Sequence, residues 1–97
     1  MEIQPEKAYI VTVEGSIEEI SPNNGKTFEL EEVQDKVEGY IEIVRLGKKQ
    51  IMIVNEEGKL DKAYNAVATE VADLHHALRY GDYICGNVVV CPSRMLP

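Results

Sequence analysis

Residues 40–54 set the tightest limit on the fold. An alternating run, YIEIVRL (40–46), leads through GKKQ into the continuous apolar run IMIV (51–54). Alternation is typical of a strand with one buried face, whereas an unbroken apolar run is typical of a strand buried on both faces. The pattern therefore predicts a β-hairpin whose second strand is buried on both faces.

Three further segments have strand-like composition. Residues 7–14, KAYIVTVE, are rich in β-branched and aromatic side chains and end at a Gly-Ser turn. Residues 16–20 form a weaker second candidate. Residues 83–91, YICGNVVVC, predict the last strand, in which Gly86 marks a bulge or a close approach.

Two segments have helical periodicity. Over 28–38, Leu30, Val33 and Val37 fall within about 60° of one another on a helical wheel. Thr27 is the expected cap of this helix, and Gly39 is its expected end.

The second helix is expected from an Asn65 cap to about Leu78, with its start left open as far back as Asp61. Its predicted apolar face consists of Val67, Val71, Leu74 and Leu78.

These elements predict an α+β fold in the order β-β-α-β-β-α-β. The simplest packing is a single mixed or antiparallel sheet of about five strands, with both helices on one face. The 97 residues suffice for one domain, residues 1–97, with 92–97 as a loosely held tail.

The stretch NEEGKL (55–60) places an amide, carboxylates and an ammonium around one glycine. Asn55 and Gly58 tolerate left-handed backbone conformations, so both favour a turn. Glu56 and Glu57 are adjacent and diverge in an extended chain, which argues against a facing acid–base pair. The spacing also lacks the alternating oxygen ligands of a calcium loop. We interpret the stretch as a turn.

The net charge of −7 lies entirely in the first part of the chain. Residues 1–38 contain ten acidic and three basic residues, whereas 39–97 contain seven of each. Direct binding to nucleic acid or to an anionic membrane is therefore not expected, because both need a basic surface. The carboxylates of the first helix are the candidate partner-binding residues: Glu29, Glu31, Glu32, Asp35 and Glu38.

Other side chains offer little chemistry. His75 and His76 diverge by about 100° on a helix and have no metal-ligand spacing around them. Cys85 and Cys91, if they share a strand, are too far apart for a disulfide and are expected to be free and buried. A Cys85–His75 nucleophile pair is conceivable, but no nucleotide-binding or hydrolase motif occurs. We expect no catalysis, no cofactor and no metal.

Several short motifs lie along about residues 30–90: Val37, Gly39, Tyr40, Asn55, Glu56, Glu57, Gly58, Asn65, Ala68, Thr69, Asp82, Ile84 and Gly86. Together they resemble a family of small domains of unknown function, number three-eight-four-six, carried by phages, plasmids and gut-bacterial mobile elements. Glu38 and the segment 62–64 depart from the usual pattern of that family. The resemblance implies a mobile-element context and no known reaction.

The function predicted from these observations is non-catalytic binding of a protein partner through the acidic N-terminal face. The start MEIQPEKAY has no signal-peptide pattern, so a cytoplasmic protein is expected.

Three alternatives stay open. One is a DNA-mimicking inhibitor of a host nuclease or DNA-binding protein, since five carboxylates over about 16 Å of helix match the charge density of a single strand. To match a duplex, Glu14, Glu18 and Glu19 must join them. Another is a small-ligand domain or enzyme with an unmarked site, around Asn65, Thr69 and Asp82. The third is an oligomer formed through a strand edge.

Overall fold

The computed structural model describes residues 2–97 as one five-stranded antiparallel sheet in the order β2-β1-β5-β4-β3. The predicted α+β class and element order are confirmed. The strands are β1 (Ala8–Val11), β2 (Ile17–Ile20), β3 (Ile41–Leu46), β4 (Gln50–Asn55) and β5 (Val88–Pro92). The hairpin β3–β4 has the predicted form, and β4 is buried on both faces.

Two main helices connect these strands, together with two shorter helical turns. The helices are α1 (Leu30–Val37), α2 (Gly58–Asp61), α3 (Ala66–Leu74) and the 3-10 turn η1 (Ser93–Met95). The short α2 was not expected, and it contains Gly58, Lys59 and Leu60, so only Glu56 and Glu57 of the stretch NEEGKL form a turn. Asn55 ends β4, and neither Asn55 nor Gly58 is left-handed. Within residues 2–97, none of the helices combines the length and the apolarity needed to cross a bilayer.

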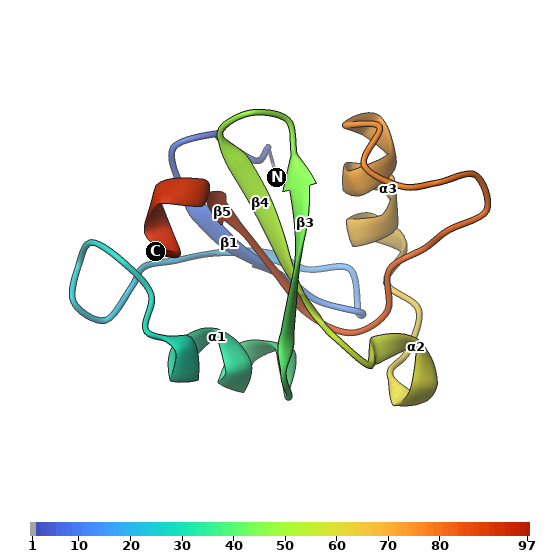
Figure 1. Cartoon of the computed structure of the whole chain (residues 1–97), viewed down its shortest axis with the longest axis horizontal. Helices are drawn as coiled ribbons and strands as arrows, with labels where there is room; N and C mark the ends of the chain where they lie inside the picture. Colours follow the sequence, from blue (N-terminus) through green and yellow to red (C-terminus); the bar gives the residue numbers. More distant parts are fainter. Residues whose placement is uncertain (1) are drawn as a thin grey trace.

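The two main helices cover opposite faces of the sheet, so the expectation that both lie on one face is wrong (Figure 1). Residues that alternate along a strand point to opposite faces. Met52 and Val90 belong to the cluster that contains residues of α3. Ile53 and Val89 belong to the cluster that contains residues of α1. Each central strand therefore contributes to two separate cores.

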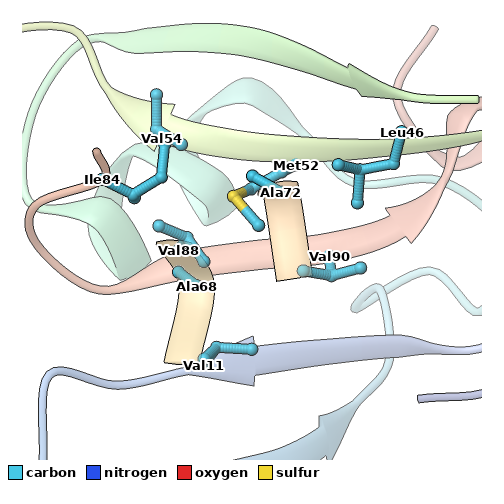
Figure 2. Close-up of a cluster of buried hydrophobic side chains, with 9 residues drawn as sticks. All are labelled: Val11, Leu46, Met52, Val54, Ala68, Ala72, Ile84, Val88 and Val90. Atoms are coloured by element: carbon cyan, nitrogen blue, oxygen red, sulfur yellow. The ribbon is translucent and has the colours of Figure 1, made fainter. Parts of the chain in front are cut away.

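Figure 2 shows the core on the α3 side. Ala68 and Ala72 of α3 lie over the central strands, and their small side chains allow the helix to approach the sheet closely. The nine buried members of this cluster are Val11, Leu46, Met52, Val54, Ala68, Ala72, Ile84, Val88 and Val90.

The core on the α1 side differs from the predicted helix face. Val33 and Val37 are buried as expected, but Leu30 is 50% exposed. Phe28, just before the helix, is buried instead, and its backbone N–H donates to Met95 O at 2.7 Å. The helix begins after Glu29, so Thr27 is not its cap.

The second main helix is shorter than predicted. It ends at Leu74, because His76 adopts a left-handed φ of 55° and the chain leaves the helix there. Leu74 is 71% exposed rather than part of the apolar face. Leu78 still packs against the α3-side core, but from the connection after the helix.

The last strand begins at Val88, later than predicted. Gly86 has a left-handed φ of 86°, and a Cβ at this position would lie 3.3 Å from the side chain of Lys62. The close approach expected at Gly86 is therefore present, and it separates Cys85 from the strand. In the segment expected to be a loose tail, Met95 and Leu96 pack against the α1-side core.

Replacing Met52 by Ala removes a fully buried side chain from the centre of the sheet. We expect M52A to lower the free energy of unfolding by about 2–5 kcal/mol. The matched control is L74A, which removes an exposed side chain and should change stability by no more than about 0.5 kcal/mol. Chemical denaturation measures both, and a large loss in L74A would contradict the observed packing of α3.

Candidate functional site

Asn55 joins the end of β4 to the end of α1. Its Nδ2 donates to the backbone oxygens of Val37 at 3.0 Å and Glu38 at 3.2 Å, and its Oδ1 accepts from Glu57 N at 2.7 Å. A Cβ on Gly39 would lie 2.7 Å from this amide nitrogen, so only glycine leaves room for it. These bonds give the NEEGKL turn a structural role.

Asn65 performs a similar task at the start of α3. Its Oδ1 accepts from Ala68 N at 2.9 Å, which confirms the predicted cap. Its Nδ2 donates to the backbone oxygens of Val11 at 3.1 Å and Gly86 at 2.8 Å, and the residue is 0% exposed. The side chain therefore ties together α3, β1 and the segment before β5.

Thr69 and Gly58 hold the same region from two sides. The hydroxyl of Thr69 accepts from Ile84 N at 2.9 Å. A Cβ on Gly58 would lie 2.7 Å from the carbonyl oxygen of Cys85, so α2 can approach this segment only with glycine there. Asn65 and Thr69, considered above as members of an enzyme pocket, thus have their polar atoms engaged by backbone groups.

Asp82 is the one member of that group whose carboxylate reaches the surface. It forms an ion pair with Lys59 of α2 and accepts from Tyr83 N at 2.8 Å. The bond to Lys59, followed by that to Tyr83 N, lowers the pKa of Asp82, and the same ion pair raises the pKa of Lys59. The Lys59 ammonium also lies 4.8 Å from the centroid of the Tyr83 ring, within cation–π range.

A groove of about 680 Å³ lies beside these residues, between the edge strand β3, α2 and residues 77–85. It contains both charged and apolar side chains. The residues that line it include Glu42, Val44, Arg45, Val54, Glu56, Glu57, Lys59, Arg79, Asp82 and Tyr83.

The acidic face predicted on the first helix is divided in the structure. Glu31 and Asp35 project opposite to the buried Val33 and Val37, as their spacing on a helix requires. Glu38, predicted to continue this face, lies beyond the end of the helix with a left-handed φ of 66°.

Two of the other carboxylates of α1 are held by the chain itself, and one is not. Glu38 is bonded to Lys62 at 3.0 Å, and Glu32 accepts from Asn23 N at 2.9 Å. Glu29 is the residue just before α1, with an extended backbone and no side-chain capping hydrogen bond. In the part of the chain that the structure describes, Glu29, Glu31 and Asp35 form no ion pair.

The cysteines and histidines do not assemble into a reactive group. Both cysteines are free and buried, and burial raises the pKa of Cys91 to about 11. His75 is exposed, with its Nδ1 3.0 Å from Val71 O, and no hydrogen bond within residues 2–97 joins it to Cys85. The same residues contain no cluster of three His, Cys, Asp or Glu side chains with metal-binding geometry.

Sequence reasoning did not single out the groove. Its charged residues come from segments that are distant in the sequence and share no spacing that marks them as a group: Glu42, Arg45, Glu56, Glu57, Lys59, Arg79 and Asp82. The available signal was indirect: the stretches NEEGKL and DYICG, noted for their family resemblance, form two of its walls.

The fold and the turn residues define a small α+β domain whose recurring motifs fix one end of the sheet. The sequence model of the family described as Domain of unknown function (DUF3846) matches residues 3–94, nearly the whole chain. The chain belongs to this family. Comparison with curated proteins and with solved structures gave no significant match.

Removing the Asn65 side chain tests the hydrogen bonds that this residue forms at the start of α3. We expect N65A to lose about 2–4 kcal/mol of stability, since it removes a helix cap and leaves two buried carbonyl oxygens without a donor. The control N23A changes an exposed asparagine whose side chain makes no hydrogen bond within residues 2–97, and it should unfold like the wild type. Equal denaturation midpoints for N65A and N23A would contradict this role.

The ion pair of Lys59 and Asp82 predicts a pH dependence at both ends of the scale. Because the pKa of Asp82 is lowered in the folded state, its contribution to stability is present above its unfolded pKa and is lost as pH falls through the folded pKa. Because the pKa of Lys59 is raised, its contribution is present below its unfolded pKa and is lost as pH rises through the folded pKa.

In K59Q, the pKa of Asp82 should therefore rise toward its ordinary value, as measured by carboxyl-carbon NMR titration. The control K48Q removes an exposed lysine that forms no ion pair among the described residues, and it should leave the titration of Asp82 unchanged.

Proposed function

We propose that this domain is a non-catalytic, mobile-element protein that binds a positively charged protein partner through the exposed carboxylates of α1. The observation that supports the proposal is the state of Glu31 and Asp35. Both are exposed, they lie one helical turn apart, and neither forms an ion pair within residues 2–97.

This arrangement is unfavourable for the helix itself. Like charges four residues apart destabilise a helix by about 0.2–0.5 kcal/mol. Lys36 is the only basic residue in α1, and it lies on the flank near Glu32 rather than on the outer face. The helix dipole favours Glu31, which lies in the first turn, but offers no such gain to Asp35, and a basic partner would relieve the repulsion between the two.

The alternative of a DNA-mimicking inhibitor receives less support. A duplex-like charge density would need the glutamates of β2 to continue the surface of α1. However, β2 forms one edge of the sheet, whereas α1 packs mainly on β3, β4 and β5. Glu19 of β2 is also close to Lys7, at 3.5 Å. A protein partner is the simpler occupant of a short acidic surface.

Charge reversal on α1 tests the proposal. The triple variant E29K/E31K/D35K changes exposed carboxylates that are free of ion pairs, so we expect it to fold normally and to lose partners captured from a bacterial lysate. Wild-type capture should weaken with rising salt, because exposed charges are screened over about 8 Å at physiological ionic strength.

A matched control separates local from overall charge. The variant E14K/E70K/D73K makes the same change in net charge at exposed positions outside α1. It should retain the partners that the α1 variant loses. If every partner captured by the wild type also binds the α1 variant, the proposed acidic interface is wrong.

A further inference from the structure

The outer edge of β3 carries a row of backbone groups that no other strand of residues 2–97 pairs with. Glu56 N donates to Tyr40 O at 2.8 Å, in line with the register in which Ile41 lies opposite Asn55. In an antiparallel pair, residues that bond to the neighbouring strand alternate with residues that point away from it. The N–H and C=O groups of Ile41, Ile43 and Arg45 therefore point outward.

This edge has few of the features that protect sheet edges. Natural edge strands are commonly short, bulged or interrupted by proline. β3 instead pairs one-to-one with β4 over six residues, without a bulge or proline, and Ile43 is 39% exposed. The opposite edge, β2, has only four residues, and one of its outward residues, Glu19, is paired with Lys7.

The groove runs along this edge on the α3 side, and its charged side chains carry a net negative charge. Glu42, Glu56 and Glu57 line it and form no ion pair within residues 2–97. Lys59 is neutralised by Asp82, which leaves Arg45 and Arg79 as two cations against these three glutamates.

A second copy of the chain fits this edge poorly. Two-fold pairing that engages all three outward residues places Ile43 opposite Ile43 of the other copy. The two Glu42 side chains then become diagonal neighbours on one face, where like charges are destabilising. A segment with basic side chains at the groove-facing positions meets the same carboxylates favourably. Its aliphatic stems can lie over Val44 and Val54.

We propose that the edge of β3 binds an extended, basic segment of the protein partner as a sixth strand of the sheet. Its backbone pairs with Ile41, Ile43 and Arg45, and its alternate lysine or arginine side chains enter the groove beside Glu42. The inference rests on the proposed function only in taking the partner to be a positively charged protein.

Amide hydrogen exchange of the full chain, followed by NMR, tests the proposal. The probe is a synthetic eight-residue peptide in which valine alternates with lysine, added at millimolar concentration. Exchange at Ile41, Ile43 and Arg45 should slow by at least about tenfold, because these amides become hydrogen-bonded. The amides of Glu42, Val44 and Leu46 already face β4 and should change little.

Each control has a defined meaning. A peptide alternating valine with glutamate should give no protection. I43P removes an outward N–H, which an edge strand tolerates, and should abolish the effect. An unchanged NMR spectrum for residues away from β3 shows that I43P is still folded. E19P makes the equivalent change on β2 and should retain binding.

Three results would overturn the inference. The first two are no protection of the β3 amides by the lysine peptide and equal protection by both peptides. The third is protection that grows with protein concentration in the absence of peptide, because this would show that a second copy of the chain occupies the edge. Because this measurement does not involve the α1 carboxylates, its failure would leave the charge-reversal experiment unaffected, and the reverse also holds.

Discussion

The burial of β4 and β5 on both faces is the constraint on which the rest of the structure depends. Each of these strands sends alternate side chains into two cores, so both faces of the sheet must be covered. The chain meets this requirement with α1 on one face and α3 on the other. The edge strands β2 and β3 carry the more exposed side chains, and the charged residues of the five strands all lie on these two.

Two buried amides then fix how the connections leave the sheet. Asn55 and Asn65 together satisfy four backbone carbonyls and two backbone N–H groups that lie away from regular secondary-structure bonding. No buried side-chain nitrogen or oxygen within residues 2–97 lacks a partner. The motifs that mark family membership thus serve largely to hold the connecting segments against the ends of the helices and strands. They position α2 and residues 82–86, which are walls of the groove, without supplying a reactive group themselves.

The sequence contained the periodic part of this structure and little of the rest. The β3–β4 hairpin, the Asn65 cap and the approach at Gly86 follow from local patterns, and all three are present. The positions of Leu30 and Leu74 were wrong because a wheel gives the direction of a side chain but not where a helix begins and ends. The apolar run IMIV (51–54) already implied that both faces of the sheet are covered, and the expectation of both helices on one face did not take this into account. The groove is formed by three stretches that are distant in the sequence, residues 42–45, 54–60 and 77–85, so no local pattern could reveal it.

The unequal cover of the two faces explains why the open groove lies beside β3. Ala68 and Ala72 bring α3 down over the centre of the sheet, and the helix ends at Leu74. The return to β5 is therefore made by irregular chain, residues 75–87, whose path includes left-handed residues at His76, Gly81 and Gly86. This segment and α2 border the edge strand without pairing with it. The edge of β3 stays open because no strand pairs with it, and the groove beside it is bordered by α2 and this irregular segment rather than by a further strand.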